Sequence, residues 1–249
     1  MRGDGPALLF LHAFPLGLFM WAGQAQAFAA THRVVRFDAR GFGASPAGDG
    51  PLSMERIADD AALLLDHLGI GQAVVAGCSM GGYAVFAMVR RHRDRLRGLV
   101  LQNTRTGADT PEARASRGLL AQKVLKEGPG AAVDAFLPRL LGDSTRRERP
   151  QLELELRHAI LKTSPRGIAN ALLGLGARAD SKDTLREIAV PTLVLGGAED
   201  VLTPPADAEA MAAAIAGSRL TILHATGHLA NLENPEAYNA ALAGFLRDA

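Results

Sequence analysis

Ser79 lies at the centre of the sequence GCSMG, residues 77–81. A short apolar run, residues 73–76, comes before it, and an alanine-rich helical pattern follows to about Arg91. In this strand–turn–helix context a tight turn strains the serine backbone and lifts the hydroxyl clear of the sheet. Both glycines are expected because a Cβ at either place would clash within the turn. The pattern predicts that Ser79 is a nucleophile.

A serine hydroxyl needs a base to become a good nucleophile. His228 lies in the short loop 225–228, directly after the last predicted strand, at the edge of the sheet where Ser79 is also expected. His12 ends a strand, and its simplest role is to hold the loop that follows. The other histidines lie at positions 32, 67, 92, 158 and 224, on predicted helices, in other loops or at a strand end. We therefore predict that His228 is the base.

The base in turn needs a carboxylate that orients its ring and stabilises the imidazolium. Glu199 and Asp200 both lie in the loop 196–204, which follows another predicted strand. Neighbouring loop residues point in different directions, so only one of them should reach His228. We favour Asp200, and the chain order Ser–Asp–His, each after a strand, supports this choice.

The negative charge that develops on a substrate oxygen in the transition state needs fixed hydrogen-bond donors. The backbone N–H of Met80 is one, because it begins the helix after the turn and benefits from the helix dipole. The second donor is expected in the loop after the first strand. Phe14 N–H is our choice, since Pro15 has no N–H.

These residues require a sheet whose strands end at one edge. Short apolar runs alternate with helical patterns, which predicts an α/β fold with a mostly parallel sheet and right-handed crossovers. The region from about residue 105 to 180 has no strand-like run, only helical segments, and a helical insertion at this place is expected to form a lid over the sheet edge. The predicted strands are residues 7–12, 33–38, 73–76, 98–102, 192–195 and 220–223. The expected organisation is a core of residues 1–104 and 181–249 with a helical lid of residues 105–180.

Composition excludes several classes of function. The 249 residues include 27 Lys and Arg and 26 Asp and Glu, a net charge of +1. The overall charge therefore gives no electrostatic attraction to nucleic acid or to a membrane surface. The single cysteine rules out an internal disulfide and fits a reducing compartment. No metal-type cluster and no apolar run that could span a bilayer is present. We expect no cofactor, no metal, no nucleic acid and no membrane partner.

The N-terminus resembles a signal peptide, with Arg2, an apolar run over 7–21 and Ala-Gln-Ala at 25–27. Against this, Asp4 is acidic, and the run supplies the first strand of the core. We therefore expect a cytoplasmic protein.

The motifs described above, taken together, resemble the α/β-hydrolase superfamily. Five of them occur in the family's order: LLFLHAFPLG (8–17), FDARGFGAS (37–45), GCSMGG (77–82), LGGAEDVLTPP (195–205) and ATGHLANLENP (225–235). The resemblance implies a triad of Ser79, Asp200 and His228, with Phe14 and Met80 as backbone donors to the oxyanion. Within the superfamily the chain resembles small esterases, cofactor-free perhydrolases and 3-oxoadipate enol-lactonases.

The chain departs from the family pattern at two places. Ala13 follows His12 where the family usually has glycine, and this affects the placement of Phe14. Only residues 1–6 precede the first predicted strand, so the usual N-terminal hairpin is short or missing. An exposed strand edge would be a site for self-association, and a homodimer is one expected state.

The leading hypothesis is hydrolysis of small or short-acyl carboxylic esters through an acyl-enzyme. The first alternative is an enol-lactonase, whose acidic substrate would require a cation in the lid. Residues 105–180 contain 13 Lys and Arg and 9 Asp and Glu, a net charge of +4, which permits such a substrate. Perhydrolysis and carbon–carbon bond hydrolysis could use the same triad. A ligand-binding receptor with weak hydrolase activity is the alternative from another class.

Overall fold

The computed structural model describes residues 3–248. Its six strands form one sheet in the order β2-β1-β3-β4-β5-β6, and every neighbouring pair is parallel. The strands are Ala7–Leu11 (β1), Arg33–Arg36 (β2), Ala73–Cys78 (β3), Leu96–Gln102 (β4), Thr192–Gly197 (β5) and Arg219–Leu223 (β6). Each coincides with a predicted run to within a few residues, so the parallel sheet is confirmed.

The central strands are apolar because helices cover both faces of the sheet. Every residue of β1 and β3 is buried, whereas the outer strand β6 is largely exposed or half-buried. The chain passes from β1 outward to β2 and then returns to β3 on the other side of β1. Ligands of open α/β sheets bind beyond the carboxyl ends of strands at such a reversal, which here are the ends of β1 and β3.

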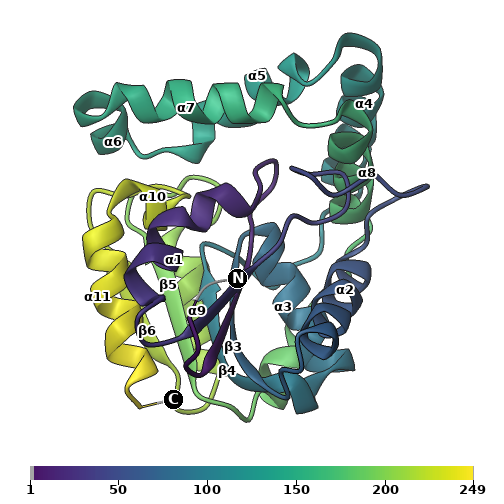
Figure 1. Ribbon diagram of the computed structural model, residues 1–249. Coiled ribbons are helices and arrows are strands. Elements are labelled where there is room, and N and C mark those ends of the chain that lie inside the picture. The colour runs from purple at the N-terminus through teal and green to yellow at the C-terminus, as the bar shows by residue number, and fades with distance from the viewer. Residues whose placement is uncertain (1–2, 249) are drawn as a thin grey trace.

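Helices α1 and α11 pack together on one face of the sheet, and α2 and α3 pack together on the other (Figure 1). Ser53 caps the N-terminus of α2, because its side chain accepts a hydrogen bond from Arg56 N at 3.1 Å. The helices outside the insertion are Ala22–Phe28 (α1), Met54–His67 (α2), Met80–Arg91 (α3), Pro205–Ala214 (α9), Ala230–Glu233 (α10) and Pro235–Leu246 (α11), with 3-10 helices Leu18–Trp21 (η1), Arg93–Arg95 (η2) and Asp183–Glu187 (η3).

Residues 105–180, the helical insertion, connect β4 to β5 and contain no strand. Helices α4 and α8 lie side by side, while α5, α6 and α7 extend across the end of the molecule beyond α1 and α10 (Figure 1). The insertion contains Pro111–Glu127 (α4), Gly130–Leu140 (α5), Asp143–Glu148 (α6), Pro150–Leu161 (α7) and Pro165–Gly176 (α8). The sequence predicted helical segments and no strand in this region, but α6 is too short for a helical period to show.

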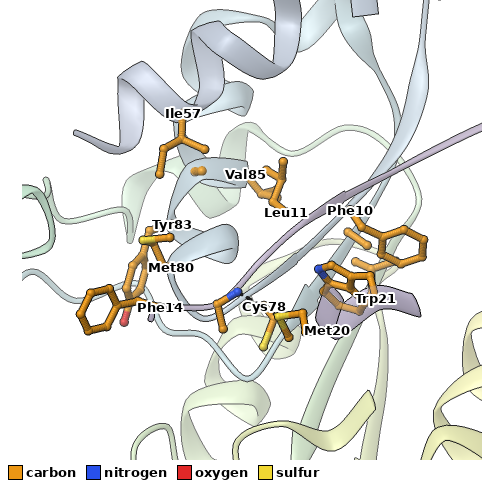
Figure 2. Close-up of a cluster of buried hydrophobic side chains, with 14 of the residues drawn as sticks. Phe10, Leu11, Phe14, Met20, Trp21, Ile57, Cys78, Met80, Tyr83 and Val85 are labelled. Carbon is orange, nitrogen blue, oxygen red and sulfur yellow. Dashed lines mark hydrogen bonds between the residues drawn. The ribbon is translucent and has the colours of Figure 1, made fainter. Parts of the chain in front are cut away.

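Aromatic side chains fix the loop after β1 against the core. The rings of Phe10 and Trp21 stack with their centroids 4.6 Å apart (Figure 2), and Trp21 also contacts Tyr238 of α11. Met20 is fully buried, and its Sδ accepts a hydrogen bond from Ala13 N at 3.2 Å. The backbone just before Phe14 is thereby tied to η1 through its buried residue Met20.

Within residues 3–248, no strand precedes β1, and β2 forms that edge of the sheet. No helix in this range is long and apolar enough to cross a membrane. Nor does this part of the chain contain a group of three or more His, Cys, Asp or Glu side chains arranged to hold a metal ion.

Candidate active site

Ser79 occupies the turn between β3 and α3 with φ 52° and ψ −111°, a region that residues with a Cβ rarely adopt. The two glycines of the turn are required by close backbone contacts. A Cβ at Gly77 would lie 2.3 Å from the carbonyl oxygen of Gly81, and a Cβ at Gly81 would lie 2.2 Å from that of Leu11. The expected strained turn is therefore present, and its glycines have the predicted reason.

The strained conformation is held from β4 and the loop that follows it. Ser79 N donates to the carbonyl oxygen of Gln102 at 3.0 Å, and Thr104 Oγ1 donates to the carbonyl oxygen of Ser79 at 3.0 Å. Strain of this kind costs of order 1–3 kcal/mol and persists only where the surroundings impose it. Ser79 is half-buried between fully buried neighbours, so its side chain is the accessible part of the turn.

His228 and Asp200 form a buried pair. His228 Nδ1 lies 2.8 Å from Asp200 Oδ2, and the two residues are 2% and 3% exposed. Since a carboxylate only accepts hydrogen bonds, Nδ1 is the nitrogen that carries the hydrogen, and Nε2 of the neutral ring is left as an acceptor. This is the ring orientation that a general base for a neighbouring hydroxyl requires.

Asp200 accepts hydrogen bonds at both oxygens. Besides His228, Oδ2 accepts from Asn103 Nδ2 at 2.9 Å and Thr203 Oγ1 at 2.5 Å, while Oδ1 accepts from Leu202 N at 2.8 Å and Thr203 N at 3.1 Å. Burial alone would raise the pKa of this carboxyl. The charge of His228 and the hydrogen bonds from His228, Thr203 and Asn103 outweigh burial and lower the pKa of Asp200 to about 2.

Asn103 and Thr203 were not predicted from the sequence. Asn103 follows β4 in the left-handed backbone region (φ 43°), and its Nδ2 also donates to the carbonyl oxygen of Gly227 at 3.1 Å. It thus joins the acid to the loop of the base. A polar residue directly after a central strand, of the type that tolerates positive φ, was the available signal. Thr203 carried no comparable signal, because its role depends on the local turn at Asp200.

Ser79 and His228 line one cavity of about 70 Å³ together with residues of both parts of the chain. The insertion contributes Arg105, Arg117, Phe136 and Leu175, and the rest of the lining is Phe14, Tyr83, Leu202 and Thr203. The side chain of Phe14 forms one wall, with its ring 5.0 Å from that of Phe136. The structure therefore brings the predicted nucleophile, base and acid to one place, with Phe14 beside them.

Met80 is the first residue of α3, adjacent to Ser79, so its N–H is among those that a helix leaves without an intrahelical partner.

Glu199, the other carboxylate considered as the partner of His228, points elsewhere: it accepts hydrogen bonds from Ser144 N at 2.8 Å and Ser144 Oγ at 2.5 Å. His12 holds loops as expected, because its Nε2 accepts from Ala39 N at 3.0 Å.

Three arginines surround Asp109 beside this cavity. Arg117 Nε and Arg178 Nη1 lie 2.5 and 2.6 Å from its carboxylate oxygens, and Arg105 Nη2 lies 4.0 Å away. Arg178 is buried over the Tyr83 ring, 4.4 Å from its centroid. Arg105 also lines a neighbouring cleft of about 680 Å³. One carboxylate thus faces three guanidinium groups at the cavity wall, and Arg105 also interacts electrostatically with Asp207 of the neighbouring cleft.

Comparison with known proteins places these features in a family. A family model described as the alpha/beta hydrolase fold matches residues 6–235. The 3-oxoadipate enol-lactonase 2 of Acinetobacter baylyi is 32% identical over 251 residues, which cover 99% of this chain and 90% of that relative.

Two solved structures are also similar. One is a thermophilic esterase from Thermogutta terrifontis with malate bound, with a TM-score of 0.97 and 42% identity over 99% of this chain and 91% of that one. The other is the enol-lactonase from Burkholderia xenovorans, with a TM-score of 0.91 and 33% identity over 99% of this chain and 93% of that one. The chain belongs to the α/β-hydrolase fold family.

Proposed function

We propose that this protein is a serine hydrolase that cleaves carboxylic esters through an acyl-enzyme intermediate. The observation that carries the proposal is the cavity in which Ser79 and His228 meet, with His228 Nδ1 held 2.8 Å from the buried carboxylate of Asp200. A nucleophile, a base and a group that orients the base are the three parts that acyl transfer requires. Esterases and lactonases among the similar proteins support the same chemistry.

In the proposed reaction His228 Nε2 takes the proton of the Ser79 hydroxyl as its oxygen attacks the ester carbonyl. The backbone N–H groups of Phe14 and Met80 hold the negative oxygen of the tetrahedral intermediate, which needs donors placed in advance. The C–O bond to the alcohol breaks, and His228 returns the proton to the leaving oxygen. Water then repeats the two steps on the acyl-enzyme and releases the acid.

The insertion serves as a lid in this proposal. Four of the ten residues that line the cavity come from it, so a substrate at Ser79 is enclosed by both parts of the chain. The cavity of about 70 Å³ supports short acyl groups rather than long ones.

The test is hydrolysis of p-nitrophenyl acetate, butyrate and octanoate by the wild type and by Ser79→Ala. We expect Ser79→Ala to lose about 10⁴-fold or more in kcat, because the nucleophile acts as a unit with its base. Ser116→Ala, at an exposed serine of α4, should retain activity and serves as the control. Equal rates for the wild type and Ser79→Ala would refute ester hydrolysis, and enol-lactone opening would then be tested before a binding protein is considered.

A carboxylate-bearing ester or lactone is the second candidate substrate. Arg105 and Arg117 line the same cavity as Ser79, and a guanidinium is well suited to bind a carboxylate. The similarity to enol-lactonases and to an esterase with bound malate points the same way. Enol-lactone opening at a higher kcat/KM than that of neutral esters would favour this candidate.

A further inference from the structure

Glu233 is a buried carboxylate, 6% exposed, that belongs neither to the proposed triad nor to the oxyanion donors. It ends the short helix α10, five residues after His228. Its Oε1 accepts from Leu229 N at 3.0 Å, and its Oε2 accepts from Gly227 N at 2.9 Å. One side chain thus holds the backbone N–H groups immediately before and immediately after His228.

The same carboxylate also reaches the insertion. Oε2 accepts from Gly142 N at 2.8 Å and from Thr145 Oγ1 at 2.7 Å, at the junction of α5 and α6. All four partners donate, so the side chain acts purely as an acceptor, as a carboxylate does. Because a buried carboxylate must have its acceptor sites filled, these donors and Glu233 are fixed together.

Backbone packing at this point leaves no room for adjustment. A Cβ at Gly227 would lie 2.3 Å from Gly142 N, so the loop of His228 and the α5–α6 junction touch without side chains between them. Both backbone polar groups of Gly227 have partners, since its N–H donates to Glu233 and its carbonyl oxygen accepts from Asn103. The loop that carries His228 therefore has little freedom while Glu233 is in place.

We infer that Glu233 is a positioning residue for His228, which holds the imidazole against Asp200 by fixing the backbone N–H groups of the two residues that flank the histidine. The expected effect on kcat rests on the proposed function, but the contact between His228 and Asp200 that Glu233 is inferred to maintain exists without substrate. An amide in place of the carboxylate would leave one acceptor oxygen and turn an NH₂ group toward a backbone donor. At least one of the two N–H groups beside His228 would then lose its partner.

The test compares Glu233→Gln with Glu199→Gln. Glu199 provides a matched control, because its carboxylate also bonds to the α5–α6 region, through Ser144, but bonds to neither N–H beside His228. Two quantities are measured: kcat and KM for p-nitrophenyl butyrate, and the downfield ¹H NMR signal of the proton between His228 Nδ1 and Asp200 in the free protein.

For Glu233→Gln we expect the NMR signal to weaken or vanish and kcat to fall about 10²-fold with little change in KM, since a misplaced catalytic group costs this much. Glu199→Gln should keep the signal and a kcat close to that of the wild type. An intact signal and kcat in Glu233→Gln would overturn the inference. So would equal losses in both variants, which would assign the effect to the attachment of the insertion.

Glu233→Asp covers the case in which Glu233→Gln does not fold. It keeps the charge but shortens the reach, so it should show the same losses to a smaller degree, and unchanged values would again overturn the inference. If the wild type hydrolyses no ester, the proposed function fails, and the NMR signal alone still decides the role of Glu233.

Discussion

Asp200 and Asp109 are both buried, and each lies next to side chains that line the cavity of Ser79, but their partners differ. Asp200, in the core, accepts from one imidazole, one amide, one hydroxyl and two backbone N–H groups. Asp109, in the insertion, faces the guanidinium groups of Arg105, Arg117 and Arg178. The first arrangement satisfies one carboxylate and orients one base, whereas the second gathers three guanidinium groups around one carboxylate.

This difference suggests a division of work between the two regions. The core side of the cavity holds the groups that would make and break bonds, each fixed by hydrogen bonds from neighbouring loops. The insertion side supplies charge that a substrate could meet. A carboxylate surrounded by hydrogen-bond donors holds its neighbouring side chains in fixed positions. A cluster of arginines has further N–H donors that can bind an anion.

The largest expected effect is on stability, at Asp109. Asp109→Asn should lower the free energy of unfolding by about 3–5 kcal/mol, because three guanidinium groups would lose the buried charge that neutralises them. Urea denaturation checks this. Asp66→Asn is the control, since Asp66 pairs with Arg95 at the surface, is 57% exposed, and should cost no more than about 1 kcal/mol. Similar small losses in both variants would show that the arginines around Asp109 do not depend on it.

A smaller effect is expected for Asp200 in acid. Its pKa is lowered from 3.8 to about 2 in the folded protein, so its contribution to stability is fully present above the unfolded value and is lost as pH falls through 4 toward 2. The shift corresponds to about 2 kcal/mol. The free energy of unfolding, measured from pH 5 to pH 2, should fall more steeply for the wild type than for Asp200→Asn by about this amount. If the free energy of unfolding fell equally with pH in both proteins, the lowered pKa of Asp200 would be contradicted.

The smallest effect is on substrate preference, at Arg105. Its guanidinium makes only a 4.0 Å contact with Asp109 and is 39% exposed, so Arg105→Gln should fold normally. We expect the preference for p-nitrophenyl succinate over p-nitrophenyl butyrate, as a ratio of kcat/KM values, to fall about tenfold. Arg93→Gln, at an exposed ion pair with Glu187, should keep the wild-type ratio. An unchanged ratio in Arg105→Gln would remove the argument for an acidic substrate.

Most of the fold and the centre of the site could be predicted from the sequence. Ser79, Asp200 and His228 each follow an apolar run, and parallel strands end at one edge of the sheet, so order along the chain was enough to bring them together. Asp200 rather than Glu199 contacts His228, as expected of neighbouring residues of a short loop, which face different ways.

Other features could not be read from local patterns. Asn103 acts across 97 residues on Asp200, and Glu233 acts across 91 residues on Gly142, so their partners are known only once the chain is folded. Helices α6 and α10 have six and four residues, too few for a hydrophobic period. The sequence showed the arginines only as a net positive charge of the insertion. Nothing in the sequence around Asp109 indicates that its side chain is buried among them.

The contact between Gly142 and Gly227 has a consequence for how this chain can vary. The insertion is joined to the core not only at its two ends but also near its middle, where two backbones touch. Sequence change in α4 can therefore reshape the wall that a substrate meets, provided that this middle joint is kept, whereas α8 is held to the core by further backbone contacts of Gly167 with Gly41 and of Gly174 with Leu52. Any exchange of the insertion between relatives would have to carry its own matching loop for the histidine, so the two segments are expected to be inherited as one unit.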